Sequence, residues 1–464
     1  MVRTICDRRA SAVQNYEREL ICAVKGIVRH QHKENKVNNN VLILGGGVAG
    51  SSMAYYLSEK GYEVTVVEKN SRVGGLARTC YYSGHPYEFG PHIWFWPGGP
   101  EDPINNTVVK LTGNELFHID RRLFTYVEAD GRKYRYPVHY EDIDQMPERQ
   151  IIHQEVRKNR DDNLKLIERK LPELGKCKFA DYFSEAIGDT LYQKFMANYT
   201  WKMWNIPGNE LETSMVWADR FHHAYTKKDE KTRGLAGYDP LKFEDHTLGK
   251  GIRFQVYPKG GWNSVWNAMV SRSKVVRDQV TSIQDEHKQP YILMRSGEKY
   301  YFADYHTVFC SIDLDELWGE DTLPYTGRMM IPLLIPGLTN AFPEGSESIH
   351  YSSCEFQTRV TEMKVITRHN SPDTLILIEV PVLPGAATCF PKNASDYAAE
   401  HNLITEKAYP QQSEKAFASY YSYVDRGKKI PNLRYVGRHA EFKYWGMPET
   451  VNSAYQKSLE FSPM

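Results

Sequence analysis

The chain of 464 residues lacks several features that would indicate particular classes of protein. It has no excess charge, because Lys plus Arg and Asp plus Glu both total 58, and a nucleic-acid binder would need a broad basic face. Its seven cysteines are odd in number and scattered, which predicts neither a disulfide framework nor a metal site. No apolar run approaches the roughly 20 residues of a membrane span, and no secretory signal precedes the first strand. We therefore expect a cytoplasmic protein with no metal, no nucleic-acid partner and no membrane span.

What the sequence does contain is the pattern of a dinucleotide-binding βαβ unit. The apolar run Val41–Leu44 is expected to form a strand buried on both faces, Ala49–Lys60 a helix, and Glu63–Glu68 the next strand. Between the first strand and the helix stands Gly45-Gly46-Gly47-Val48-Ala49-Gly50, which fits G-x-G-x-x-G. The first glycine allows a tight turn, the second admits a pyrophosphate, and the third lets the helix pack closely on the strand.

One feature beyond the glycines indicates a dinucleotide, and a second favours FAD over NAD. Glu68 ends the second strand near the offset of about 20 residues at which a carboxylate accepts ribose hydroxyls. The segment 72–78 then supplies a second glycine turn at Gly74-Gly75, followed by Arg78, which is expected to approach the edge of the isoalloxazine. An ordinary turn with a solvent-exposed arginine is the alternative. The residues predicted to bind FAD in this region are Gly45, Gly47, Val48, Ala49, Gly50, Glu68, Lys69, Gly75, Leu76, Ala77 and Arg78.

Two distant segments are expected to complete the cofactor site. Val280 lies in a strand-like segment, 275–283, and its backbone could pair with the adenine edge; an ordinary sheet strand is the alternative. Near the C-terminus, residues 433–438 form a strand that enters a glycine turn at Gly437. Residues 450–459 are expected to form a helix whose N-terminal dipole faces the flavin.

The remaining patterns predict an α/β fold with a Rossmann-like FAD-binding part, an inserted helical lobe and a second, mostly antiparallel β-sheet domain. Residues 1–39 are interpreted as an N-terminal extension, and 40–140 as the FAD-binding part, completed by 250–285 and 430–464. Helical periodicity predicts the lobe over 141–240, with helices at 148–170, 179–187 and 190–198. β-branched segments predict the sheet domain over 286–429, with strands at 291–295, 307–309, 360–368 and 374–380.

Five sequence blocks in register resemble the UDP-galactopyranose mutases, a family of FAD enzymes related in fold to the amine oxidases and protoporphyrinogen oxidase. The blocks run in order from the first glycine turn to the C-terminal helix. They are Gly90-Pro91-His92-Ile93, Tyr199-Thr200-Trp201-Lys202-Met203-Trp204, Tyr257-Pro258-Lys259-Gly260-Gly261-Trp262, Thr358-Arg359-Val360-Thr361-Glu362-Met363-Lys364, and Gly437-Arg438 with Lys443-Tyr444 and Met447.

The resemblance implies roles for several residues. His92 and Arg438 are expected as catalytic residues beside the flavin, although a histidine among Trp94, Phe95 and Trp96 is by residue type more often a packed core residue. His92, Gly437, Arg438 and Met447 are added to the cofactor site. The substrate site is expected to contain Tyr199, Trp204, Arg220, Arg328, Gln357 and Tyr444.

The chain departs from the family pattern at several of these positions. Gln357 stands where the family has a substrate-binding Tyr, and Leu-x-Tyr-Arg becomes Leu323-Pro324-Tyr325-Thr326, with Arg328 two residues further on. The C-terminal motif differs at Phe442 and Pro448. Diphosphate binding is compatible with these changes, whereas recognition of galactose is left open.

The function implied by the resemblance is the interconversion of pyranose and furanose forms of a UDP-sugar, UDP-galactose or similar. It would proceed through a covalent adduct between the sugar and N5 of reduced FAD. No second dinucleotide fingerprint is present, so the reducing equivalents are expected from NAD(P)H that docks transiently or from another reductant. An FAD-dependent oxidoreductase of the amine oxidase type and an FAD-binding protein without mutase turnover are the alternatives. The sequence leaves a homodimer open.

Overall fold

The computed structural model describes residues 38–155 apart from 120, 121, 137 and 139, residues 178–211, residues 253–382 apart from 343–345, 354 and 355, and residues 403–464 apart from 404. The structural statements below concern these residues. Three predictions fall on other residues: the extension before residue 38, the C-terminal part of the helix expected over 148–170, and Arg220.

A five-stranded parallel sheet forms the Rossmann-like part. Its strands in spatial order are β10 (Lys274–Arg277), β2 (Glu63–Glu68), β1 (Asn40–Leu44), β14 (Thr307–Cys310) and β20 (Leu433–Tyr435). Strand β14 belongs to this sheet and not to the antiparallel domain to which the sequence assigned it. All four of its residues are buried, as an interior parallel strand requires, and such a run carries no alternation that would identify its sheet.

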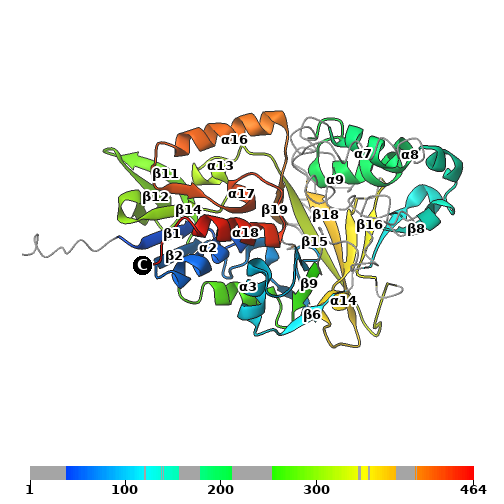
Figure 1. Ribbon diagram of the computed structural model, residues 1–464, viewed down its shortest axis with the longest axis horizontal. Coiled ribbons are helices and arrows are strands. Elements are labelled where there is room, and N and C mark those ends of the chain that lie inside the picture. Colours follow the sequence, from blue (N-terminus) through cyan, green and yellow to red (C-terminus); the bar gives the residue numbers. More distant parts are fainter. Residues whose placement is uncertain are drawn as a thin grey trace, which may run out of the picture. The chain divides into compact units, whose positions relative to one another are not determined.

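Both faces of β1 are buried, which explains its unbroken apolar run. Val41 and Ile43 face a core formed with α2 (Val48–Glu59), α3 (Pro103–Thr112), α12 (Trp262–Met269) and α18 (Met447–Ser458). Leu42 and Leu44 face a second core under α13 (Leu314–Leu317), α16 (Glu414–Gly427) and a small sheet of β11 (Val280–Glu286), β12 (Gln289–Met294) and β13 (Lys299–Tyr301). Figure 1 shows α16 and α13 on one side of β1 and β14, and α2 and α3 on the other.

A seven-stranded sheet forms the second domain. In spatial order it contains β19 (Thr405–Pro410), β15 (Tyr325–Ile335), β18 (Thr374–Val382), β17 (Arg359–Glu362), β16 (Ser348–Tyr351), β7 (Leu123–Val127) and β8 (Arg132–Arg135). Every neighbouring pair is antiparallel except β16 with β7. The prediction of a mostly antiparallel sheet is therefore confirmed.

Two predicted strands have different boundaries. The segment 360–368 is a strand only to Glu362, after which α14 (Met363–Thr367) begins. Met363, Ile366 and Thr367 are buried at helical spacing, a signal that the β-branched residues of this segment concealed. The segment 275–283 is two strands, because the chain leaves the parallel sheet after β10 and enters the small antiparallel sheet at β11.

The helical lobe contains α4 (Tyr140–Ile143), α7 (Phe179–Ile187), α8 (Asp189–Leu191), a π-helical segment (Tyr192–Ala197) and α9 (Asn198–Trp204). The prediction of a helix over 179–187 is confirmed. The remaining strands are β3 (Cys80–Tyr82) with β4 (His85–Tyr87), and β5 (Trp94–Pro97), β9 (Arg253–Pro258) and β6 (Leu116–His118) in that spatial order. α17 (Gly437–Ala440) follows β20. In the part of the chain that the structure describes, no helix is both long and apolar enough to cross a bilayer.

Candidate functional site

A cavity of about 1360 Å³ lies outside the carboxyl ends of the parallel strands, where open α/β sheets bind their ligands. Its wall is formed by the first glycine turn, the second glycine turn, the seven-stranded sheet and the helical lobe. The volume exceeds the roughly 300–1,000 Å³ of a typical small-molecule pocket. The cavity is therefore large enough for more than one ligand of ordinary size.

The first glycine turn has the backbone geometry that a bound pyrophosphate requires. Gly45 has φ of +92°, a conformation open to glycine but rare for other residues. α2 begins after Gly47 without a side-chain cap, and Gly47, Val48 and Ala49 line the cavity. The free N–H groups and positive dipole end of the helix thus face the cavity.

The two glycine turns touch each other and form one backbone wall. Gly74 N donates to Gly46 O at 2.7 Å, and a Cβ on Gly75 would lie 3.1 Å from the Cα of Gly47. Gly75, Leu76 and Ala77 continue this wall of the cavity. A Cβ on Gly75 would therefore press against the backbone of the first turn, and glycine lets the two turns pack this closely.

Glu68 is held beside the first glycine turn by two backbone N–H groups. Its Oε2 accepts from Gly46 N and its Oε1 from Asn70 N, each at 2.8 Å, and the residue is 5% exposed. A carboxylate has about four acceptor sites, so its remaining lone pairs can accept ribose hydroxyls. Lys69, paired with Glu316 at 3.3 Å, and Val280, at the start of β11, line the same cavity.

Arg78 lines the cavity and is paired with an acid. Its Nη2 donates to Glu406 Oε1 at 2.6 Å and its Nη1 to Gly75 O at 2.7 Å. The guanidinium carbon also lies 5.0 Å from the centre of the Phe89 ring. Arg78 is therefore a fixed, paired charge and not the solvent-exposed arginine of the alternative interpretation.

A second helix N-terminus, that of α18, also faces the cavity. The helix begins at Met447, three residues before the predicted start, because Pro448 occupies the first helical turn, where proline is favoured. Its N-terminus has no side-chain cap, and Met447, Pro448, Glu449 and Thr450 line the cavity. The N-terminal end of α18 therefore faces the cavity, as the sequence predicted.

His92 lies in the cavity wall as a neutral imidazole. Burial, together with the nearby cations Arg438 and Arg359, lowers the pKa of His92 to about 3. Its Nδ1 is buried and has no hydrogen-bond partner among the described residues. The backbone is held by Trp262 Nε1, which donates to His92 O at 2.5 Å. The ring can therefore offer a neutral acceptor or donor to a ligand, but not a positive charge.

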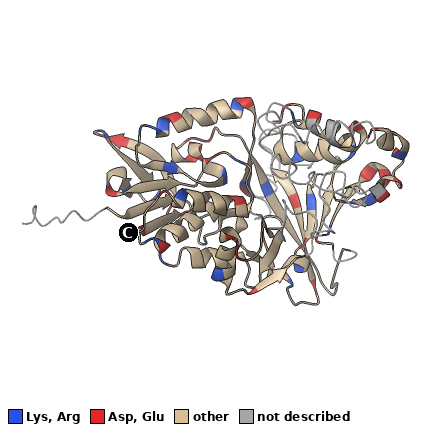
Figure 2. Ribbon diagram, in the orientation of Figure 1, with Lys and Arg blue, Asp and Glu red and all other residues tan. Residues whose placement is uncertain are grey.

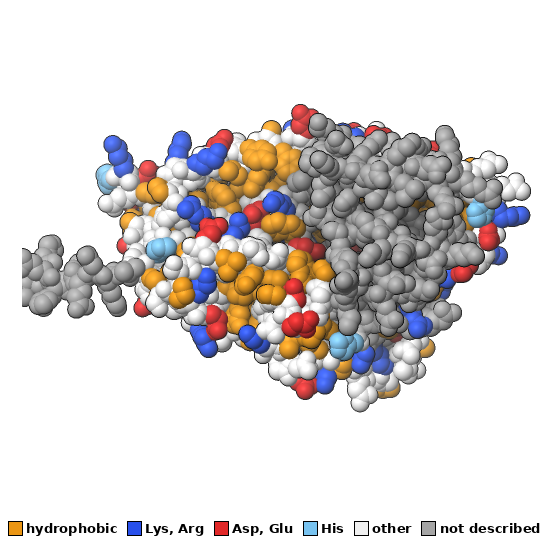
Figure 3. Space-filling view, viewed as in Figure 1, with side chains coloured by type: hydrophobic (Ala, Val, Ile, Leu, Met, Phe, Trp, Pro, Cys, Tyr) orange, Lys and Arg blue, Asp and Glu red, His pale blue; other side chains and the backbone are white. Residues whose placement is uncertain are grey.

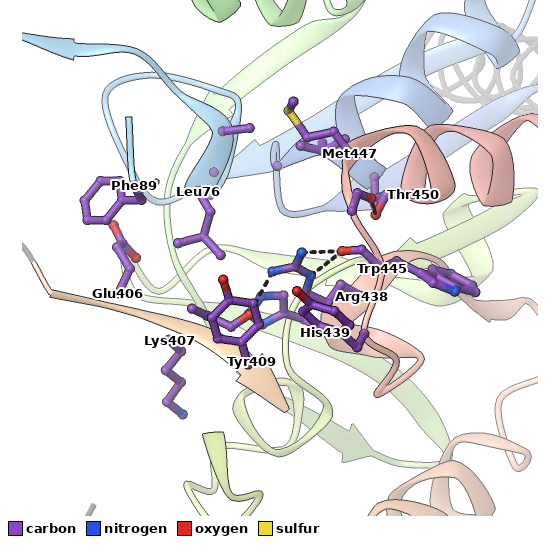
Figure 4. A pocket seen from close by; sticks show the side chains of 18 of the residues that line it. Leu76, Phe89, Glu406, Lys407, Tyr409, Arg438, His439, Trp445, Met447 and Thr450 are labelled. Atoms are coloured by element: carbon purple, nitrogen blue, oxygen red, sulfur yellow. Dashed lines mark hydrogen bonds between the residues drawn. The ribbon is translucent and has the colours of Figure 1, made fainter. Parts of the chain in front are cut away.

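Arg438 projects from α17 into the same cavity, as Figure 4 shows. Its Nε and Nη2 donate to Trp445 O, and its Nη1 donates to Ala408 O at 3.0 Å. A guanidinium has five N–H groups. Three of those of Arg438 make these bonds, so two N–H groups are available to an anion. The guanidinium carbon lies 5.2 Å from the Tyr409 ring centre and 5.4 Å from that of Tyr444.

Arg328 and Arg359 share the buried carboxylate of Glu379. Arg328 Nε donates to Glu379 Oε1 at 3.0 Å and Arg359 Nε to Glu379 Oε2 at 3.1 Å. Burial alone would raise the pKa of Glu379, but the two arginines hold it below its ordinary value. Arg328 is 1% exposed and also donates to Met203 O and Gly327 O, whereas Arg359 lines the cavity. The cation that this network presents to a ligand is thus Arg359.

An aromatic cluster closes the cavity beside the helical lobe. Trp204 contacts Tyr444 edge-on at 4.8 Å and Tyr409 at 5.5 Å between ring centres. Tyr199 stacks on His350 at 5.2 Å. The side chains come from α9, β16, β19 and the segment after α17. They bring ring faces and phenol groups next to Arg438 and Arg359.

Four residues of the predicted site do not line the cavity. A Cβ on Gly50 would lie 1.9 Å from Gly45 O, and a Cβ on Gly437 would lie 2.3 Å from that of Ala49, so both glycines permit close packing under the turn. Arg328 is enclosed by its partners, as described above. Gln357 contributes its backbone carbonyl, which accepts from Lys202 Nζ at 3.0 Å.

Arg359 and Tyr409 line the cavity but were not among the site residues that the sequence predicted, and the same is true of several others, including His439. Arg359 stands in one of the recognised blocks, but nothing in the sequence distinguishes it from the other polar residues of a strand. Tyr409 precedes Pro410 in β19, and one tyrosine among 31 carries no signal of its own. Both are assigned by their position in the folded chain.

Charges of both signs alternate over the described surface. Figure 2 shows Lys and Arg interspersed with Asp and Glu along the ribbon, and on the face in Figure 3 both signs stand between hydrophobic side chains. No continuous basic stripe is visible in these views of the described residues. An anionic ligand would therefore be held by local cations.

Comparisons with known proteins agree with this architecture. Residues 43–111 match the family model of the NAD(P)-binding Rossmann-like domain, and residues 251–444 match that of UDP-galactopyranose mutase. The dTDP-fucopyranose mutase of Escherichia coli is 22% identical over 90% of this chain and 97% of its own length. A probable UDP-galactopyranose mutase of Klebsiella pneumoniae is 20% identical over 91% of this chain and 95% of its length.

A crystal structure of reduced UDP-galactopyranose mutase superimposes with a TM-score of 0.66 at 17% identity, covering 90% of this chain and 93% of that chain. The similarity spans both the Rossmann-like part and the second sheet. These findings confirm the resemblance and the fold class that the sequence predicts.

Proposed function

The chain is related in sequence and fold to the UDP-galactopyranose mutases, and we propose that it is a flavin-dependent isomerase of this kind. It would interconvert the pyranose and furanose forms of a nucleoside-diphosphate sugar, with UDP-galactose or a similar UDP-sugar as the expected substrate. The dTDP-fucopyranose mutase among its relatives makes dTDP-sugars the next class to test.

The cradle of the two glycine turns supports FAD as the cofactor. It combines backbone N–H groups at the start of α2 with a fixed carboxylate at Glu68, which suits an adenosine diphosphate group. The second glycine turn and the N-terminus of α18 extend the cradle, so a ligand longer than a mononucleotide fits along it. When bound and reduced, FAD would supply a nucleophilic nitrogen, N5, for attack on the anomeric carbon.

The observation that carries the proposal is the pairing of two guanidinium groups with phenol groups in this cavity. Arg438 and Arg359 line it together with Tyr199, Tyr409 and Tyr444. Guanidinium groups bind phosphate oxygens through paired N–H donors, and a phenol adds one further donor. We assign the sugar diphosphate to this group of residues, and an aromatic contact with its base to Trp204.

The remaining residues would shape the environment of the reacting sugar. His92 is neutral, because its burial and, secondarily, the nearby cations Arg438 and Arg359 lower its pKa to about 3. It can therefore hydrogen-bond to a neutral hydroxyl without adding charge. Aromatic side chains around it exclude water, which protects a reactive sugar intermediate from hydrolysis.

The decisive experiment is anaerobic incubation of the dithionite-reduced protein with UDP-galactose, other UDP-sugars, dTDP-sugars and GDP-sugars. The expected result is a furanose product from one nucleotide class, formed by reduced protein and not by oxidised protein. A parallel incubation with NADPH or NADH in place of dithionite would identify the physiological reductant.

Three results would count against the proposal. Turnover by the oxidised protein, with bleaching of the flavin by substrate, would indicate an oxidoreductase. Bound FAD without furanose formation from any sugar would indicate a binding protein. A colourless protein that cannot be reconstituted with FAD would contradict the cofactor assignment itself.

A further inference from the structure

A second histidine, His439, follows Arg438 in α17 and also lines the cavity. The charged groups near His439 differ in sign from those near His92. His92 faces two cations and is neutral, whereas Nδ1 of His439 contacts Oδ1 of Asp313 at 2.5 Å. Figure 4 shows His439 beside Arg438 and Tyr409.

The carboxylate that holds His439 is buried and ionised. Asp313 follows β14 and directly precedes α13, with no side-chain capping bond to that helix, and its side chain is 6% exposed. Burial alone would raise the pKa of Asp313, but His439 and Lys407 lower it below its ordinary value. A buried carboxylate on Nδ1 fixes the proton there and leaves Nε2 to exchange a proton with the cavity.

Other groups around the pair fix its geometry and connect it to solvent. The Tyr325 ring stacks on the imidazole, with centres 5.4 Å apart and planes 10° apart. Lys407 Nζ lies 3.8 Å from Asp313 Oδ2 and 2.6 Å from Asp321 Oδ1. Asp315 on α13 faces Tyr325 and Lys407. The side chain of Asp321 is 82% exposed, so these groups extend from the surface to the cavity wall.

The arginine and lysine side chains that line the cavity cannot change charge at neutral pH. Four of them have a carboxylate partner, in the pairs Arg78–Glu406, Lys69–Glu316, Lys407–Asp321 and Lys457–Glu441. Arg359 is bound to Glu379. Arginine and lysine keep their protons in this range, whereas histidine gains and loses one between about pH 5 and 8.

We propose that His439, held by Asp313, is a redox-linked proton acceptor of the flavin cavity. The inference rests on the FAD part of the proposed function and goes beyond the sugar chemistry. Its role is to balance the negative charge that arrives when the bound flavin is reduced, so that the reduced form is favoured.

The role of His439 follows from the charge that reduction of the flavin adds to the cavity. When a reductant such as dithionite delivers two electrons and the flavin ring takes up one proton, one negative charge remains in the cavity. In the proposed step, Nε2 of His439 takes a second proton from solvent, and the imidazolium held by Asp313 offsets that charge. On oxidation the same proton returns to solvent.

The test is a count of protons taken up per flavin during anaerobic reduction, together with the midpoint potential of the bound flavin against pH. Each coupled proton changes the potential of a two-electron couple by about 30 mV per pH unit. Wild-type protein near pH 7 to 8 is expected to take up two protons, with a slope of about 60 mV per pH unit. His439→Gln, which keeps an amide to meet Asp313, is expected to take up one, with about 30 mV per pH unit.

A second variant and a control complete the design. Asp313→Asn removes the carboxylate that stabilises the imidazolium, so the second proton should be taken up only at lower pH. Arg426→Gln breaks an exposed ion pair with Glu320 at the cavity mouth and should behave like the wild type. Equal proton counts in the wild type and His439→Gln, or a count of one in the wild type, would overturn the inference. Because no sugar is used, these results are independent of whether a furanose forms.

Discussion

Tyr409 shows how one side chain can serve both the fold and the site. Its ring lies between two guanidinium groups, 4.7 Å from the Arg328 carbon and 5.2 Å from that of Arg438. The ring therefore holds the Arg438 guanidinium in place by cation–π contact. The phenol oxygen adds a hydrogen-bonding group to a cavity wall that two arginines already make suitable for a diphosphate.

Tyr409→Phe should separate these two roles. The ring contacts persist, so the free energy of unfolding should change by less than about 1 kcal/mol, whereas a lost hydrogen bond to a charged phosphate is worth about 1.5–3 kcal/mol. We expect the affinity for UDP or dTDP, measured by calorimetry, to fall by about 10-fold to 100-fold. Tyr291→Phe, whose hydroxyl bonds to Gln284 outside the cavity, is the matched control. Unchanged nucleotide affinity in Tyr409→Phe would remove Tyr409 from the diphosphate site.

At the scale of elements, the junction of β1, the first glycine turn and α2 depends on the absence of a side chain at Gly50. A Cβ there would lie 1.9 Å from Gly45 O and 3.0 Å from its carbonyl carbon. These are backbone atoms and cannot rotate away, so α2 would have to move off the sheet. Because the same helix presents its N-terminus to the cavity, its displacement would also open the pyrophosphate cradle.

We therefore predict that Gly50→Ala lowers the free energy of unfolding by about 3 kcal/mol or more and abolishes FAD binding. Chemical denaturation and the visible flavin spectrum measure the two effects. The matched control is Gly113→Ala at the C-terminus of α3, where φ is +59° but no atom lies within 4 Å of a Cβ. It should cost only about 1 kcal/mol of backbone strain and retain FAD. A Gly50→Ala protein that folds and remains yellow would contradict the close-packing argument.

At the scale of the whole molecule, a buried acid links the segment after the second glycine turn to the sequence block that begins at Tyr257. Glu88 is fully buried, and its Oε1 accepts from Tyr257 at 2.5 Å and Thr79 at 3.0 Å. Burial raises the pKa of Glu88 from 4.5 to about 8, although these hydroxyls lower it in part. In the unfolded chain the carboxyl ionises near pH 4.5. Between pH 4.5 and about pH 8, the folded protein therefore holds a proton on Glu88 that the unfolded chain has lost.

This pKa difference predicts a loss of stability as the pH rises. The stabilising proton is fully bound below about pH 4.5 and is lost as the pH passes through about 8, a difference of at most about 5 kcal/mol. From pH 6 to pH 8 the free energy of unfolding should fall by about 2 kcal/mol. Glu88→Gln cannot ionise and should lack this component, so its stability relative to the wild type should increase with pH. Parallel curves for the two proteins in urea denaturation would show that Glu88 is not the group responsible.

The local parts of the dinucleotide site could be predicted because they are contiguous in sequence. Strand, glycine turn, helix, strand and acid follow one another within residues 41–68, and short-range sterics and hydrogen bonding specify each of them. The five family blocks were likewise recognisable in order. The comparisons with known proteins confirm the family resemblance and the fold class. The individual roles of the site residues stay predictions.

The pairing of charges could not be predicted, because it joins residues that are distant in the chain. Glu379 binds Arg328 and Arg359, Glu406 neutralises Arg78, and Asp313 holds His439 across more than a hundred residues. Only folding decides which arginine faces the cavity and which histidine meets a carboxylate. Local backbone preferences act over a few residues and are encoded in the order of amino acids, whereas desolvation and Coulomb interactions depend on distances that exist only after the sheets and helices have packed.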